Sequence, residues 1–207
     1  AAGVARAADL LRGEPRSVAV LLSVELCSLT LQREDLSIAN LVASGLFGDG
    51  AAAVVVGGDA RPNKGPAIRA SESVLYSDSR GVMGWRFSEQ GFELVLTAQV
   101  PDMVRAHLAR DVDRFLSKHG LAREDIGRWI AHPGGPKVLD AIGEALELPP
   151  AALARSWESL AQVGNLSSAS VLLILEQNLL EPPPPGTLGL LFALGPGFCS
   201  ELVLLEW

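Results

Sequence analysis

The chain has 207 residues, 48% of them hydrophobic, and a net charge of −7. This composition is typical of a well-buried globular protein and excludes a disordered chain. The negative charge argues against a general polyanion-binding surface, so we expect no nucleic-acid partner, whereas a local basic pocket for a phosphorylated ligand is compatible with it. No apolar run reaches membrane-spanning length and no signal-peptide pattern opens the chain. We therefore expect no membrane span and a cytoplasmic location.

The first elements predicted are helix, strand, helix and strand. Apolar residues at helical spacing indicate a helix over 2–12. The continuous apolar run 18–24 is of strand length and predicts a strand covered on both faces. A short helix at 38–44 then leads through a glycine turn to a second buried strand at 51–56.

Residues 59–99 carry mixed signals, with weak strand patterns near 67–73 and 92–96. A clear amphipathic helix follows over 101–118, with Pro101 near its first position and Gly120 after its end. The later pattern predicts these elements: a strand at 129–131, helices at 137–146, 151–160 and 167–180, a proline connector at 182–185, and strands at 188–194 and 199–206.

Two glycine loops, at 46–50 and 194–197, each enter a hydrophobic strand. A repeated half-domain would produce this pattern, and the site of such a protein lies where the halves meet. We expect an α/β fold divided as follows: 1–60 as the remainder of a first half, 61–100 as a connecting and cavity-covering segment, and 101–207 as a second half.

Two polar residues have the setting of a catalytic group. His132 follows a buried strand and precedes Pro133 and two glycines, at the strand end where α/β folds place reactive side chains. Asn165 stands at the entry to an apolar helix beside small residues. A satisfied core histidine and an asparagine helix cap explain the same patterns, so both interpretations stay open on the residues alone.

Four segments resemble the signatures of type III polyketide synthases of the chalcone and stilbene synthase family, within the thiolase superfamily. They are Leu-Phe-Gly-Asp-Gly-Ala-Ala-Ala (46–53), Trp-Ile-Ala-His-Pro-Gly-Gly-Pro (129–136), Gly-Asn-Leu-Ser-Ser-Ala (164–169) and Gly-Pro-Gly (195–197). They occur in the family's order, and the resemblance runs along the whole chain. It implies a thiolase-like αβαβα layered fold of two similar halves, of which the first is incomplete here.

The resemblance implies decarboxylative condensation of malonyl-CoA onto an acyl-CoA starter, followed by cyclisation to a pyrone, a resorcinol or a related aromatic product. His132 and Asn165 match the family's catalytic pair, whose N–H groups stabilise an enolate oxygen. Phe47 and Phe92 match its two gating phenylalanines, although the match at Phe92 is one residue short. Lys137 is a candidate for coenzyme A phosphate, or a solvated surface lysine.

Other positions match the family's elongation cavity. These are Cys27, Thr30, Gly84, Ser167, Gly195, Pro196 and Gly197. Cys27 and the three residues after it resemble bacterial members that make alkylpyrones and alkylresorcinols. We expect CoA thioesters as substrates, no cofactor, no metal and a homodimer.

Neither cysteine matches the family's nucleophile. Cys27 and Cys199 lie in apolar surroundings, as reduced and buried cysteines do. In the family the reactive cysteine opens the helix that resembles 1–11, so we expect it a few residues before Ala1, in a missing N-terminal part. The chain alone is therefore predicted to be inactive.

Two other interpretations remain open. One is a ketoacyl-ACP synthase III or an HMG-CoA-synthase-like condensing enzyme, which shares the fold and a Cys-His-Asn set. The other is a catalytically dead thiolase-fold subunit that stabilises an active partner. A Gly-Cys dipeptide just upstream of Ala1 would favour the enzyme over the dead subunit.

Overall fold

A four-stranded sheet forms the centre of the molecule. The computed structural model describes residues 1–62, 65–89 and 91–207 and orders the strands β3-β8-β7-β6. Strand β7 runs parallel to β6 and antiparallel to β8, which is in turn antiparallel to β3. The bounds are β3 (Ala67–Leu75), β6 (Ile126–Ala131), β7 (Leu188–Gly195) and β8 (Cys199–Glu206).

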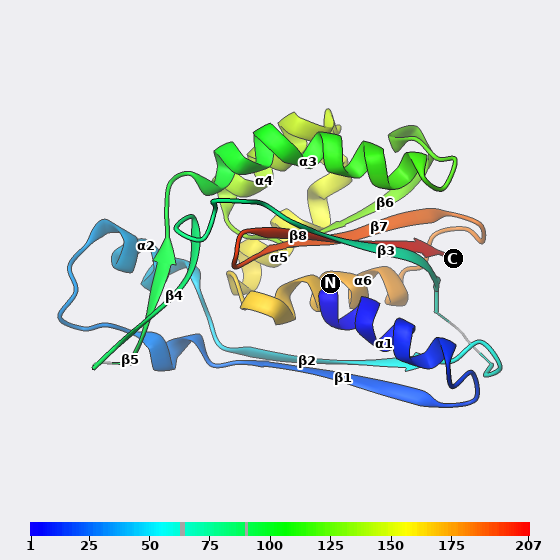
Figure 1. Cartoon of the computed structure of the whole chain (residues 1–207), viewed down its shortest axis with the longest axis horizontal. Helices are drawn as coiled ribbons and strands as arrows, with labels where there is room; N and C mark the ends of the chain where they lie inside the picture. Colours follow the sequence, from blue (N-terminus) through cyan, green and yellow to red (C-terminus); the bar gives the residue numbers. More distant parts are fainter. Residues whose placement is uncertain (63–64, 90) are drawn as a thin grey trace.

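Two layers of helices cover the two faces of this sheet (Figure 1). Helices α3 (Val100–Ser117) and α4 (Pro136–Leu146) pack on one face, where Leu108, Phe115 and Ile142 join the sheet's side chains in the largest core cluster. Helices α1 (Ala2–Arg12) and α6 (Ser170–Leu180) pack on the other face. Because both strand faces are covered, β7 reads as a continuous apolar run.

A strand pair lies beyond α1 and α6. Strands β1 (Val18–Glu25) and β2 (Gly50–Gly57) are antiparallel, and Leu21, Ala52 and Val54 pack on the helix layer. Helix α6 is therefore enclosed between two sheets, which explains why its apolar residues are not confined to one face of the helix. The sequence α1-β1-β2 has the same order as α6-β7-β8, as two similar halves require.

The outer face of β1 is open, contrary to the prediction that this strand is covered on both faces. Val20, Leu22 and Val24 are 60%, 69% and 65% exposed, and Val55 of β2 is 70% exposed. Side chains alternate along a strand, so one row packs inward while the other has no layer against it within the described residues. The layers are thus helix, sheet, helix and strand pair, one helix layer short of αβαβα.

This open face predicts the behaviour of the 207 residues on their own. A contiguous apolar strand face of this kind drives association in water. We expect the isolated chain to aggregate, or to need a partner that covers β1 and β2. Sedimentation velocity of the purified chain checks this, and a monomer that melts cooperatively would contradict it.

A smaller unit projects at the end of the strand pair (Figure 1). Strands β4 (Met83–Ser88) and β5 (Gly91–Leu96) form a hairpin beside α2 (Ile38–Leu46). The pattern near 92–96 predicted β5, whereas β4 was not predicted. The remaining elements are α5 (Ala154–Val163) and the 3₁₀ helices η1 (Cys27–Thr30), η2 (Arg123–Asp125), η3 (Pro150–Leu153) and η4 (Ser167–Ala169).

The expected division of the chain into 1–60, 61–100 and 101–207 differs from the arrangement of the strands at one place. Strand β3 lies within 61–100, yet it pairs with β8 and so completes the sheet of the second half. Within the described ranges, no helix has the length and apolar character needed to cross a membrane.

Candidate active site

The two halves of the fold join through backbone hydrogen bonds at Phe47 and Asn165. These residues form a parallel bridge. Asn165 N donates to Leu46 O at 2.8 Å, and Gly48 N donates to Asn165 O at 3.0 Å. Gly164 has φ +72°, and a Cβ built on it would lie 2.7 Å from Leu46 O. Only glycine allows the two backbones to approach this closely.

The side-chain amide of Asn165 is held in one orientation. Its Oδ1 accepts from Ser167 N at 2.8 Å, and its Nδ2 donates to Gly134 O at 3.2 Å. The first partner is an obligatory donor and the second an obligatory acceptor, so the amide oxygen and nitrogen are assigned without ambiguity. Asn165 is only 3% exposed, and one N–H of Nδ2 is left over to meet a reacting oxygen.

His132 lies in the same turn, directly after β6. Its N donates to Phe192 O at 2.9 Å, and its O accepts from Gly134 N at 3.0 Å. Gly134 thus bonds to His132 and to Asn165 and brings the two predicted residues together. Burial lowers the pKa of His132 to about 4. The imidazole is therefore neutral at pH 7, with one N–H to donate.

The lowered pKa of His132 predicts a pH-dependent stability. Between its ordinary value of 6.5 and about 4, the unfolded chain binds a proton on this ring that the folded protein does not. Stability should therefore fall as pH falls through this window. As pH is lowered from 6.5 to about 4, the denaturant concentration at the unfolding midpoint should fall less steeply in His132→Gln than in the parent protein. Equal slopes in the variant and the parent would contradict a buried, neutral His132.

A cavity of about 570 Å³ lies beside Asn165, although neither Asn165 nor His132 is among its lining residues. Phe47, Cys27, Thr30 and Ser167 line it, as the resemblance implied. Phe47 and Ser167 are bonded to Asn165 through the backbone bridge and the Ser167 N–H, so the cavity opens next to the amide. Its far wall is the β4–β5 hairpin, which contributes Trp85, Arg86, Glu93, Leu94, Val95, Leu96 and Thr97.

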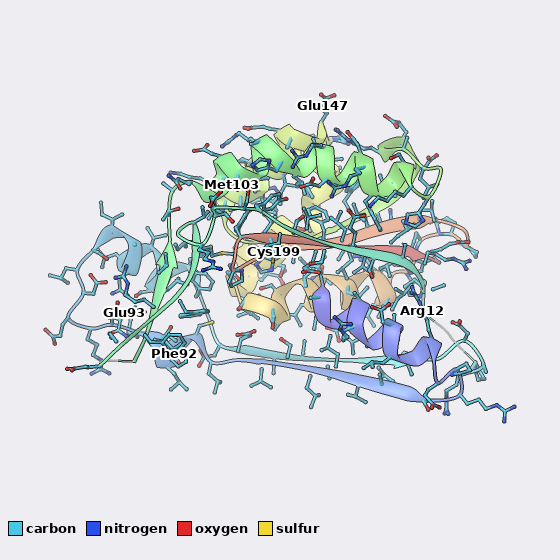
Figure 2. The ribbon with its side chains drawn as sticks, viewed as in Figure 1. Arg12, Phe92, Glu93, Met103, Glu147 and Cys199 are labelled. Atoms are coloured by element: carbon cyan, nitrogen blue, oxygen red, sulfur yellow. The ribbon has the colours of Figure 1, made fainter. Side chains whose placement is uncertain are left out.

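The structure does not bring Phe92 to this lining. Phe92 is 51% exposed and packs on Phe87 and Trp85 of its own hairpin, and Figure 2 shows it to one side of the four-stranded sheet. The register pairs Trp85 with Leu94 and Phe87 with Phe92. Leu94 lies two residues after Phe92 on β5, so their side chains share a face. Of the two, Leu94 is the one that lines the cavity.

Five other predicted positions also lie outside the lining. Gly84 flanks Trp85, which does line the cavity. The turn between β7 and β8 contains Gly195, Pro196 and Gly197. It contacts the base of the β4–β5 hairpin, where Gly197 N donates to Met83 O at 3.4 Å. Lys137 is exposed at the start of α4.

Two carboxylates that the motifs did not single out hold the cavity wall. Asp49 accepts from Ser28 N at 2.7 Å and from Ser28 Oγ at 2.6 Å, and these bonds lower the pKa of Asp49. They fix the turn that carries Cys27. Glu25 accepts from Ser168 N at 3.2 Å and from Ser168 Oγ. In the sequence, Glu25 is visible only as a carboxylate at the end of a strand, whereas Asp49 lies within the 46–53 motif but was given no role.

The two thiols are not activated. Both are partly buried and free. Burial, followed by Glu25 and Asp49, raises the pKa of Cys27; burial, followed by Glu201, raises that of Cys199. A nucleophilic cysteine needs a lowered pKa, so neither has that character. In the described part of the chain, no group of three His, Cys, Asp or Glu side chains is placed to hold a metal ion.

The layered fold with His132 and Asn165 at the junction of its halves is that of the thiolase-like condensing enzymes. The crystal structure of 1,3,6,8-tetrahydroxynaphthalene synthase from Streptomyces coelicolor A3(2), a bacterial type III polyketide synthase, superposes with a TM-score of 0.94 at 34% identity, over 100% of this chain and 59% of that one. PKS-I from the brown alga Ectocarpus siliculosus gives 0.88 at 29% identity, over 99% and 56%.

Residues 67–206 match the C-terminal domain of chalcone and stilbene synthases, and the chain belongs to this family. It is 60% identical over 211 residues to 1,3,6,8-tetrahydroxynaphthalene synthase of Streptomyces peucetius subsp. caesius, covering 100% of this chain and 56% of that protein. It is 41% identical to a putative chalcone synthase of Bacillus subtilis, covering 100% and 59%. The chain thus spans little more than half the length of these relatives.

Proposed function

We propose that the full-length protein is a type III polyketide synthase in which this chain supplies the oxyanion hole. The observation that carries the proposal is the fixed amide of Asn165, with one N–H left over, beside a neutral His132 and a cavity. Malonyl-CoA loses CO₂ and leaves an enolate, whose oxygen accepts from the two N–H groups. The enolate carbon then attacks the enzyme-bound thioester, and the thiolate leaves.

The nucleophile in this proposal is a cysteine that precedes Ala1. Helix α1 supports it, because the backbone nitrogen of Ala1, just before the helix, lies near His132. Ala1 and Val4 pack in the core cluster that contains Ile130 of β6, two residues before His132, so this end of the helix is sheltered. A helix N-terminus favours a thiolate, and the neutral ring of His132 can accept the thiol proton and then pair with the thiolate.

We propose a polyhydroxylated aromatic product of the tetrahydroxynaphthalene type. The 60% identity to a tetrahydroxynaphthalene synthase supports it over a pyrone or a resorcinol. The 1,3,6,8 pattern of oxygens is what a chain of two-carbon units leaves on cyclisation, so malonyl-CoA alone would supply every carbon. Coenzyme A contacts from Lys137 and a homodimer belong to the same proposal.

Product analysis of the full-length protein tests this function. We expect a coloured or readily oxidised polyhydroxynaphthalene, identified by mass, from malonyl-CoA without an added starter. A panel of acyl-CoA and aroyl-CoA starters shows whether another primer is preferred. Failure to decarboxylate malonyl-CoA under all of these conditions would favour a catalytically dead subunit.

A further inference from the structure

A buried polar network lies outside the site, between α3 and the four-stranded sheet. Tyr76 Oη donates to Asp111 Oδ2 at 2.7 Å and lies 3.2 Å from Ser200 Oγ. Asp111 is 0%, Ser200 1% and Tyr76 8% exposed. On the other side of the carboxylate, Arg110 Nε and Arg114 Nη1 lie 3.3 Å and 3.5 Å from Oδ1. A buried carboxylate with this many partners holds its neighbours in one arrangement.

The network continues by hydrogen bonds into the turn between β7 and β8. Tyr76 N donates to Phe198 O at 3.0 Å. Ser79 Oγ donates to Tyr76 O and accepts from Phe198 N, each at 2.7 Å. Phe198 is 0% exposed and packs with Tyr76, Val82 and Val100 in a separate core cluster. The ring of Tyr76 is therefore fixed from both of its ends.

From this turn the bonds reach the base of the β4–β5 hairpin. Val82 N donates to Ser79 O at 3.0 Å, and Gly197 N donates to Met83 O at 3.4 Å. Thr97 N and Thr97 Oγ1 both bond to Val82 O at 3.1 Å. Met83 and Leu96, which pair at the base of the hairpin, pack against the same cluster as Phe198.

Beyond its base, the hairpin packs against two short elements, α2 and η1. Among the described residues, neither β4 nor β5 pairs with a third strand, and the hairpin projects away from the central sheet (Figure 1). Its outer end has a bond from Gln32 Nε2 to Phe92 O at 3.1 Å. It nevertheless supplies the far wall of the cavity, through Trp85, Arg86 and residues 93–97.

We propose that Tyr76, Asp111 and Ser200 are positioning residues that set the place of the β4–β5 hairpin and hence the width of the cavity. The inference rests on the proposed function, since the width matters only if a growing chain occupies the cavity. A hairpin that moves more freely admits chains of other lengths and other folded shapes. Decarboxylation at His132 and Asn165 does not depend on that wall.

Two substitutions in the full-length protein test the proposal. Tyr76→Phe removes the hydroxyl and keeps the ring, and Ser200→Ala is a milder change that covers the case in which the first variant fails to fold. Ser73→Ala is the matched control, because it removes an exposed serine–carboxylate bond, to Glu201, from β3, three residues before Tyr76.

Hydrogen exchange is the first measurement, because it needs no substrate. Amides of 83–89 and 91–97 should exchange about fivefold faster in Tyr76→Phe and Ser200→Ala, the effect of losing one net hydrogen bond. Ser73→Ala should match the parent. Unchanged exchange in both variants, or an equal rise across α3 and the central sheet, would overturn the proposal.

Product analysis is the second measurement. The ratio of products of different chain length should shift in the two variants, while the rate of malonyl-CoA decarboxylation stays at the parent value. A constant product ratio, or a proportional loss of both activities, would refute a positioning role. A parent protein that makes no product would instead count against the proposed function, and hydrogen exchange would still decide whether the network holds the hairpin.

Discussion

Replacing Asn165 with Asp in the full-length protein should lower the rate of malonyl-CoA decarboxylation by about 10²–10³-fold, the usual effect of losing one oxyanion donor. The substitution keeps the side chain's size and the oxygen that accepts from Ser167 N. It removes the N–H groups of Nδ2 and places a negative charge near the enolate. The bond from Nδ2 to Gly134 O is also lost, so stability should fall somewhat, while the retained Ser167 bond keeps the turn and the transition state loses stabilisation.

Substitutions at His132 measure the contribution of the second oxyanion donor apart from that of Asn165. His132→Ala should cost a comparable factor, and His132→Gln, which retains an N–H, should recover part of it. His119→Ala is a suitable control, because His119 lies beyond the end of α3 with its ring against Phe115. Decarboxylation at the parent rate in Asn165→Asp or His132→Ala would exclude the oxyanion-hole assignment.

Gly164→Ala should unfold the junction between the two halves. Gly164 has φ +72° and ψ −156°, a region that is essentially restricted to glycine. Strain of this kind costs on the order of 1–3 kcal/mol. In addition, the new Cβ would lie 2.7 Å from Leu46 O, a backbone atom that is itself bonded to Asn165 N. The bridge between Phe47 and Asn165 would have to open, so activity should fall together with stability.

A second glycine separates strain from collision. Gly186 also has a positive φ, +84°, but no atom lies within 4 Å of a Cβ built on it. Gly186→Ala should therefore lower the free energy of unfolding only by the backbone strain. Denaturant unfolding of the full-length proteins makes the comparison. A Gly164→Ala variant as stable and active as Gly186→Ala would show that the close approach at Leu46 is not required.

The sequence could single out the proposed pair, His132 and Asn165, because both residues occur in short local motifs. The turn 132–136 and the segment 164–169 each specify their own geometry through glycine and proline, so the resemblance could place His132 and Asn165. The orientation of the amide could not be predicted in this way. It depends on Gly134 O and Ser167 N, and the first of these lies in another element.

Features that depend on distant partners were harder to predict. The apolar run of β1 indicates burial on both faces, but the layer that would cover Val20 and Leu22 is not formed by the described residues. Strand β3 looked like part of a connecting segment because its partner, β8, lies at the other end of the chain. Phe92 was assigned by a family match that is one residue short, whereas the structure puts Leu94 and not Phe92 in the cavity lining.

The buried network at Tyr76 gave no sequence signal. Asp111 lies on an amphipathic helix where an acidic residue normally faces water, and only the fold turns it inward to 0% exposure. Tyr76, directly after β3, and Ser200, in β8, are far apart in sequence. Such contacts become visible only when the sheet and α3 are placed together.

The central claim is that this chain supplies an oxyanion hole to a nucleophile that lies outside it. The most direct test is to incubate the full-length protein with malonyl-CoA, digest it, and locate the covalent acyl group by peptide mass. We predict an adduct on a cysteine that precedes Ala1, with Cys27 and Cys199 unmodified. An adduct on Cys27 or Cys199, formed at a rate that matches turnover, would contradict the claim.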